Sequence, residues 1–394
     1  MKTTLGCMII MVLLALAGCS NYKELNELSI VLGLGIDYLP NKDMYEVTYQ
    51  VVNPIENAAK STGSGTTPVI DIKTTGKTLA EAAINHANVF SRRNIYSHIQ
   101  VIVLGETLAR KESLNFIFDI FERDANVRVN IPILVARNTD VKTLLDTLVT
   151  IDKIPVRSLE GKLENSSQIL GDHANTKIYD VIEDLTNLGS EPAISGITVI
   201  GNKKTGITKK NLESMEKSYA ALNGIGLFRK GMLVGWMEGH KTKSLQIIAN
   251  KIKRTYLRIP CDEKHYNAVI IDRLRSHTHV DVTNNQTEIT VQVQGYGFIA
   301  EMLCNTDISQ RNVLRKYEDE AALEMEKEIK EGIRFAQKMK SDVFGFGEIL
   351  HYSHLRKWND HKGQWDELFS KAKITVHARI DIEGVGMRIK PYPY

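Results

Sequence analysis

The longest regular pattern in the chain, residues 307–340, reads DISQRNVLRKYEDEAALEMEKEIKEGIRFAQKMK. Apolar residues recur in it every three or four positions, which is the spacing of one face of an α-helix. This apolar stripe consists of Leu314, Tyr317, Ala321, Met325, Ile329, Ile333 and Ala336. At 1.5 Å per residue the helix would be about 50 Å long, and its charged residues from Glu318 to Glu331 would face solvent. A stripe of this length requires a sheet or another helix to cover it.

Two strand patterns in the same region offer that cover. Polar and apolar residues alternate over 373–382, which is the period of a half-buried strand. Before the helix, similar alternation on both sides of Asn284-Asn285 predicts a hairpin. Residues 257–394 are therefore predicted to form a C-terminal domain in which the long helix packs on a sheet.

Strand and helix patterns alternate in the first two hundred residues. Residues 45–51 alternate like a strand, and Thr78 and Glu81 have the spacing of a capping box at the start of a helix predicted over 78–92. The later patterns predict strands over 98–104, 131–136 and 194–200, and helices over 107–122, 156–170 and 177–187. This order is typical of a mixed α/β domain, which we expect over 19–200.

The middle of the chain has a different organisation. A lysine-rich stretch over 201–217 precedes a hairpin predicted over 221–237, and a helix is predicted over 241–254. We therefore expect a middle hairpin-plus-helix domain over 201–256. The whole chain is predicted to be an α+β or mixed α/β protein of two to three domains, each a small mixed sheet packed with helices.

Composition narrows the class of protein. The chain has 394 residues, 43% of them hydrophobic and 25% charged, which suits packed globular domains. Its formal net charge is only +3, from 50 basic and 47 acidic residues. Nucleic acid is therefore not an expected partner, because such binding depends on a strongly basic surface.

The first 18 residues are predicted to be a signal peptide. Lys2 is followed by an apolar run from Leu5 to Leu16, which is short for a membrane-spanning helix. The run ends in Leu16-Ala17-Gly18-Cys19, which resembles a bacterial lipobox. Cys19 is thus the predicted lipidation site, carrying S-diacylglycerol and able to take an N-linked acyl chain such as palmitate. An uncleaved anchor helix is the alternative.

Cleavage would leave three of the four cysteines in the mature chain. Cys7 would leave with the leader, and Cys19 would be occupied by lipid. Cys261 and Cys304 remain, and their separation along the chain does not say whether they meet. We expect two free buried thiols, with a single disulfide as the alternative.

A few residue groups invite a catalytic or metal-binding interpretation. His277, His279 and Asp281 would project from one strand face and could ligate a metal, but that face is expected to be the solvated one. His351 and His354 are one helical turn apart, without a carboxylate at zincin spacing. A metal-dependent cell-wall enzyme built on these groups is the corresponding hypothesis.

Two other motifs also give little support to an enzyme. Gly33-Leu34-Gly35 lacks the third glycine of a dinucleotide fingerprint, so structural glycines are expected there. No GxSxG elbow is present. The sequence therefore predicts a non-enzymatic protein with no catalytic residues, no cofactor and no metal.

Several segments, taken in order, resemble one family. They are LAGC at 16–19, KELNEL at 23–28, GLGID at 33–37, SRR at 91–93, VLGE at 103–106, GIGLF at 224–228, FGFGE at 344–348, HYSH at 351–354 and WDELF at 365–369. Each is weak alone, but the ordered set resembles the C-subunit lipoprotein of spore germinant receptors, the Ger(x)C family. The resemblance spans essentially the whole mature chain.

That resemblance implies a three-domain α/β lipoprotein at the outer surface of the spore inner membrane. It implies two integral-membrane partners, the A-type and B-type receptor subunits, and anchoring to the bilayer through Cys19. The implied role is a scaffolding or coupling subunit in germination triggered by small nutrients. An alternative from the residues is an extracytoplasmic solute-binding lipoprotein that captures a small ligand between its domains.

Overall fold

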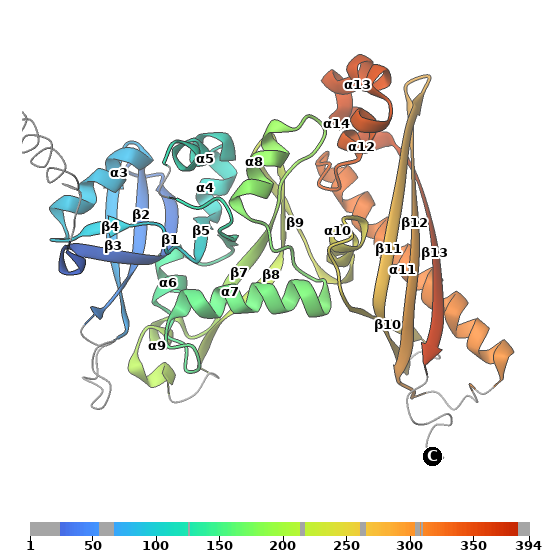
Figure 1. Ribbon diagram of the computed structural model, residues 1–394, viewed down its shortest axis with the longest axis horizontal. Helices are drawn as coiled ribbons and strands as arrows, with labels where there is room; N and C mark the ends of the chain where they lie inside the picture. Colours follow the sequence, from blue (N-terminus) through green and yellow to red (C-terminus); the bar gives the residue numbers. More distant parts are fainter. Residues whose placement is uncertain are drawn as a thin grey trace, which may run out of the picture.

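The computed structural model describes residues 24–54, 67–124, 127–212, 217–260, 265–303, 308 and 310–384. Two β-sheets lie side by side along the long axis of the molecule (Figure 1). The first sheet is formed by strands before residue 240, and the second by strands after residue 250. The predicted mixed α/β fold class is confirmed.

The first sheet has nine strands, in the order β3-β2-β1-β5-β6-β7-β8-β9, with β4 paired to β1. They are β1 (Leu28–Leu39), β2 (Met44–Val52), β3 (Val69–Gly76), β4 (Arg93–Ile95), β5 (Val101–Gly105), β6 (Ile133–Ala136), β7 (Ala193–Gly201), β8 (Ser218–Arg229) and β9 (Met232–Met237). Strands β1, β5, β6 and β7 run parallel, and antiparallel strands flank them on both sides. The sheet is therefore mixed.

Helices cover both faces of this sheet (Figure 1). They are α3 (Leu79–Asn85), α4 (Glu106–Lys111), α5 (Leu114–Arg123), α6 (Val141–Asp146), α7 (Pro155–Asn165), α8 (Ile178–Thr186) and α9 (Lys203–Gly206). One apolar core lies under α3, α4, α5 and α8, and a second lies under α6 and α7. The first unit is thus a three-layer sandwich.

The second sheet has the order β10-β11-β12-β13. Its strands are β10 (Thr255–Pro260), β11 (Tyr266–Thr283), β12 (Gln286–Glu301) and β13 (Lys373–Gly384). Strand β13 runs parallel to β12, and the other pairs are antiparallel. The predicted turn at Asn284-Asn285 forms with positive φ at both residues, which asparagine tolerates.

The long predicted helix is α11 (Arg311–Met339), and it packs on this sheet. Its apolar stripe is buried from Tyr317 to Ala336, whereas Leu314 is only partly buried. The remaining helices of the second half are α10 (Lys243–Ile248), α12 (Phe346–Ser353), α13 (Leu355–His361) and α14 (Trp365–Lys371). Single turns are η1 (Leu25–Glu27), η2 (His86–Asn88), η3 (Ser166–Leu170), η4 (Lys209–Leu212), η5 (Gly239–Thr242) and η6 (Lys362–Gln364).

Some predicted helices differ from the structure. The helix predicted over 78–92 ends at Asn85, the one over 107–122 is two helices, and the one over 241–254 spans 243–248. The predicted hairpin forms, and β8 pairs with β7, so these strands continue the first sheet. The division into domains at 200/201 and 256/257 stays a prediction.

Candidate functional site

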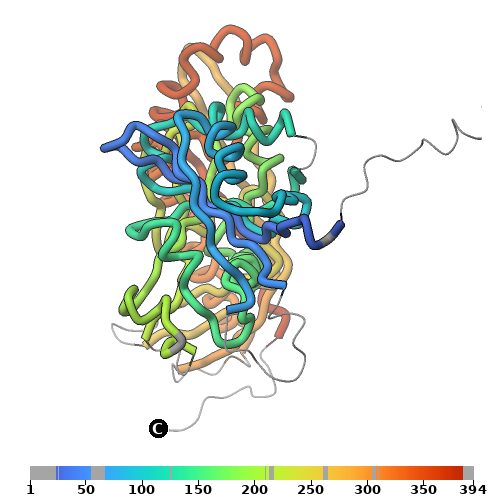
Figure 2. Tube along the Cα trace, turned by 90° about the vertical axis from the view of Figure 1, so that its left-hand side faces the viewer, coloured from blue at the N-terminus to red at the C-terminus, as the bar shows by residue number. Residues whose placement is uncertain are grey.

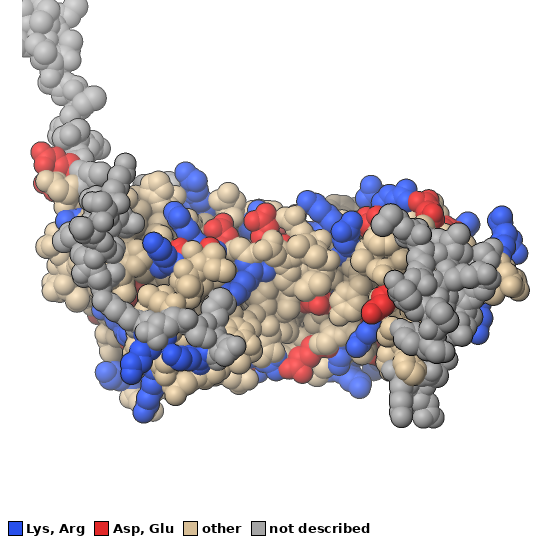
Figure 3. All heavy atoms as spheres, turned by 90° about the horizontal axis from the view of Figure 1, so that it is seen from below, with Lys and Arg blue, Asp and Glu red and all other residues tan. Residues whose placement is uncertain are grey.

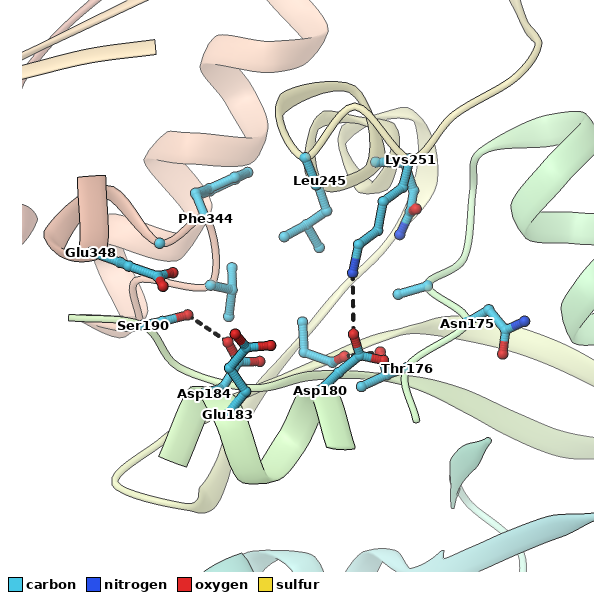
Figure 4. A pocket seen from close by; sticks show the side chains of 16 residues that line it. Asn175, Thr176, Asp180, Glu183, Asp184, Ser190, Leu245, Lys251, Phe344 and Glu348 are labelled. Carbon is cyan, nitrogen blue, oxygen red and sulfur yellow. Dashed lines mark hydrogen bonds and ion pairs between the residues drawn. The ribbon is translucent and has the colours of Figure 1, made fainter. Parts of the chain in front are cut away.

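A cavity of about 260 Å³ lies where the two units meet (Figure 4). Helix α8 of the first unit lines one side, the segment around α10 a second, and the loop before α12 a third. Its polar lining includes Asp180, Glu183, Asp184, Lys251 and Glu348. Apolar lining comes from Leu245, Val343 and Phe344. Segments far apart in the sequence thus converge on one small space.

Carboxylates dominate the polar side of this cavity. Lys251 Nζ lies 3.4 Å from Asp180 Oδ1, and Ser190 Oγ donates a 2.7 Å hydrogen bond to Asp184 Oδ1. Burial raises the pKa of Asp184 to about 7. Burial, followed by the charge of Glu183, also raises the pKa of Glu348. Such a lining can accept hydrogen bonds from a small solute or bind a positively charged group on it.

The loop before α12 is organised around Asp342, a buried residue. The Asp342 carboxylate accepts hydrogen bonds from the Phe346 and Gly347 backbone N–H groups at 3.2 and 2.8 Å, and from Trp365 Nε1 at 2.9 Å. It thereby satisfies free N–H groups at the start of α12. Burial nevertheless raises its pKa to about 6, because three donors do not replace full hydration.

The same loop joins the two units. Glu191 N donates to Asp342 O at 3.0 Å, and Glu348 N donates to Gly189 O at 3.2 Å. Asn187 Nδ2 donates to Glu348 Oε1 at 3.2 Å. A Cβ on Gly347 would lie only 2.7 Å from the Cα of Gly189. We call residues 187–191 and 342–348 the junction clasp; it contains the FGFGE segment.

A second group of the family-like segments meets at the carboxyl ends of β1 and β5. Trp236 Nε1 donates to Glu106 Oε1 at 3.0 Å, and the guanidinium carbon of Arg137 lies 4.8 Å from the Trp236 ring centroid. Asp37 packs so closely that a Cβ on Gly105 would lie 2.1 Å from its Oδ1. Burial raises the pKa of Asp37 to about 6. These contacts connect β1, β5, β6 and β9.

The structure does not assemble the histidines into a metal site. His277 and His279 are exposed, and Asp281 is ion-paired with Lys357. The His279 and His354 rings have centroids 6.3 Å apart, and the His351 ring packs near Trp358. Over the described residues, no group of three or more His, Cys, Asp or Glu side chains could hold a metal ion.

Gly33 and Gly35 have a packing role. A Cβ on Gly33 would lie 2.3 Å from Val156 Cγ1, and one on Gly35 would lie 2.2 Å from Val141 Cγ1. Helices α6 and α7 therefore approach β1 closely only because both residues lack a side chain. This close approach agrees with the expectation of structural glycines.

Cys19, the leader over 1–18, Cys261 and Cys304 lie outside the described residues. The periodicity and motifs of the sequence do not single out Asp342, Asp184 or Gly189. An isolated carboxylate or glycine has no periodic or motif signal, and its burial depends on segments that meet only in the folded chain. Among the residues that the structure does describe, no helix has the length and apolar character needed to cross a bilayer.

Two family models match this chain, one in each half. Residues 21–199 match the model described as spore germination protein N-terminal domain, and residues 223–386 match spore germination B3/GerAC like, C-terminal. The chain is thus a spore germination protein by class. It belongs to the Ger(x)C family of germinant receptor C-subunits.

Individual relatives are similar to this chain over nearly its whole length. Spore germination protein KC of Bacillus subtilis (strain 168) is 28% identical over 398 residues, which cover 99% of this chain and 97% of the relative. Spore germination protein B3 of the same organism is 23% identical, covering 95% and 96%. The crystal structure of the GerBC protein superposes with a TM-score of 0.54 at 20% identity, covering 89% of this chain and 97% of that one. The last comparison shows a shared fold.

Proposed function

We propose that this chain is a non-enzymatic lipoprotein subunit of a germinant receptor, acting as scaffold and coupling subunit beside an A-type and a B-type integral-membrane subunit. The observation that carries the proposal is the match of both family models, one to each half of the chain. The junction clasp supports it, because a body whose two units are bonded together can transmit a displacement from one end to the other. Its location would be the outer surface of the spore inner membrane.

The physical role of the tether is to raise local concentration. Lipid on Cys19 would confine the folded body to a thin layer above the bilayer, where the membrane subunits lie. Two or more acyl chains hold a protein to a membrane far more firmly than one, since each buried CH₂ contributes about 0.8 kcal/mol. Coupling would then need no high intrinsic affinity for the partners.

Replacing Cys19 by Ala tests this role. We expect the mature variant chain not to be retained at the membrane, because the lipid-accepting thiol is gone. Spores that carry it should germinate weakly in response to nutrients. Cys7→Ala is the matched control, because that cysteine lies in the predicted leader. Membrane fractionation and nutrient-triggered germination of spores are the measurements. A Cys19→Ala chain that is retained and fully responsive would refute the tether.

The cavity between the units favours a second candidate, capture of a small solute. Its volume of about 260 Å³ accommodates a molecule of a few heavy atoms, and its carboxylates suit a ligand with N–H or ammonium donors. Calorimetry of the purified chain against amino acids and sugars distinguishes the candidates. Saturable binding without any membrane subunit favours solute capture, and its absence leaves the scaffold proposal in place.

A further inference from the structure

The described chain begins at one end of the molecule, beside a short edge strand. Figure 2 views the molecule from that end, where the N-terminal part of the chain is blue. Leu28, at the start of β1, pairs with Arg93 of β4. Leu28 is the ninth residue after Cys19. An extended chain of that length spans at most about 30 Å. Lipid on Cys19 would therefore hold the surface around β4 close to the membrane.

This surface combines exposed apolar side chains with two arginines, of which Arg93 is exposed and Arg92 is half-buried. Ile84 at the end of α3 is 73% exposed, and Val89 just after η2 is 61% exposed. Arg92 and Arg93 follow, and neither has an ion-pair partner among the other described residues. We call Ile84, Val89, Arg92 and Arg93 the tether-side surface.

A hollow of about 730 Å³ adjoins these residues. Its lining includes Leu28, Ile84 and Phe90 on the apolar side and both Arg92 and Arg93 on the basic side. Two arginines that line a partly apolar hollow match a phosphate headgroup joined to acyl chains. The hollow and its two arginines therefore fit a phospholipid surface.

The local fold explains why these side chains point outward. Ala82 and His86 are buried, and the His86 ring packs against Tyr49 and Phe90 at centroid distances of 5.3 and 5.6 Å. With that face turned inward, Ile84 is left on the opposite face of the short helix. The packing of His86 in η2 thus leaves the Ile84 side chain exposed.

We propose that the tether-side surface docks on the anionic phospholipid surface of the membrane that holds Cys19. This inference rests on the proposed lipidation. Exposed aliphatic side chains beside arginines are the pattern of interfacial membrane contacts. Glu24 and Glu27 lie at the start of the described chain and Asp124 lines the hollow, so they offset part of the basic charge. Insertion of Ile84 and Val89 must therefore accompany the electrostatic contact.

Spin-label accessibility on vesicles tests the docking. The full lipidated chain, with Cys261 and Cys304 replaced by Ser, carries a nitroxide at Val89→Cys or, as a control, at Leu323→Cys, whose native side chain on α11 is 65% exposed. Vesicles contain either phosphatidylglycerol with phosphatidylethanolamine or phosphatidylcholine alone. Flotation shows whether the lipid tether attaches the chain to the vesicles. The ratio of oxygen collisions to nickel-chelate collisions shows how deep the nitroxide lies in the membrane.

On phosphatidylglycerol vesicles we expect the ratio of oxygen to nickel-chelate collisions to be raised for the label at position 89 and not for the label at position 323. Arg92→Glu with Arg93→Glu should lower the ratio of docked to undocked chains by about 30-fold, at roughly 1 kcal/mol for each arginine removed from an anionic surface. Arg311→Glu with Arg315→Glu, exposed on α11, is the control and should leave the ratio unchanged.

Chains that float with the vesicles while position 89 stays in water would overturn the docking and leave the tether intact. Chains that do not float would overturn both proposals. A label at position 89 that is protected only when the membrane subunits are present would also overturn lipid docking, since it would assign the surface to a protein partner.

Discussion

Two glycines allow the two backbone segments of the junction clasp to approach each other closely. A Cβ on Gly347 would lie 2.6 Å from Trp365 Nε1 and 2.7 Å from the Cα of Gly189, distances that side chains do not adopt without movement. We expect Gly347→Ala to lower the free energy of unfolding by about 1–3 kcal/mol. Urea unfolding measures it, and Gly363→Ala is the control because a Cβ there meets nothing within 4 Å. Equal stability of the two variants would contradict the clasp.

Asp184 gives the molecule a defined pH dependence. Its folded-state pKa of about 7 lies above the ordinary value of 3.8, so between these values the folded state binds the extra proton. Its contribution to stability is complete below about pH 4 and is lost as the pH rises through 7. Asp184→Asn removes this loss. Between pH 5 and pH 8 the free energy of unfolding of the variant should therefore rise by about 2 kcal/mol relative to that of the unmodified chain.

Unfolding by denaturant at both pH values measures this gain. Asp360→Asn, which changes an exposed carboxylate on α13, is the control and should show no such gain. A parallel pH dependence in Asp184→Asn and the unmodified chain would show that Asp184 is ionised at pH 5. The sequence does not identify this group, because its pKa is raised by burial, which depends on how the folded chain packs.

At the scale of elements, α11 protects the open edge of the second sheet. Glu326 Oε1 accepts a hydrogen bond from Ala378 N at 3.1 Å, and Glu318 Oε1 accepts one from Ile382 N at 2.9 Å. These backbone N–H groups lie on the side of β13 that has no neighbouring strand. Unpaired edge groups invite pairing with another chain, so the two glutamates shield the edge.

Removing both glutamates should expose that edge. We expect Glu318→Ala with Glu326→Ala to cost about 1–2 kcal/mol per lost hydrogen bond and to increase self-association at high concentration. Thermal unfolding and light scattering are the measurements, with Glu320→Ala on the same helix as control. A double variant as stable and as monomeric as the control would contradict the shielding role.

The sequence predicted the longest elements well and the short helices poorly. Helix α11 and the hairpin of β11 and β12 follow from long periodic patterns, and the structure contains both. The helix predicted over 107–122 breaks at Ser113 because Leu114 N donates to Gly231 O at 2.9 Å, instead of continuing the helix. A contact with a residue more than a hundred positions away leaves no periodic signal.

At the scale of the whole molecule, the two sheets form one elongated body with mixed surface charge. Basic and acidic side chains are interspersed on the face shown in Figure 3. Periodicity predicted the strands of β8 and β9 but not their membership of the first sheet, because alternation identifies the buried face of a strand and not its neighbour. A ligand site between domains was an alternative from the sequence, but the residues that line the junction cavity were not predicted, since they come from three distant segments.

Membership of a membrane-bound receptor is the proposal on which the function of this chain rests. Its most direct test is quantitative isolation of the chain, through an affinity tag, from detergent-solubilised spore membranes. We expect recovery of the A-type and B-type subunits in stoichiometric amounts, with the mature chain beginning at a lipid-modified Cys19. Recovery of the chain alone, with an intact leader and no membrane subunit, would contradict it.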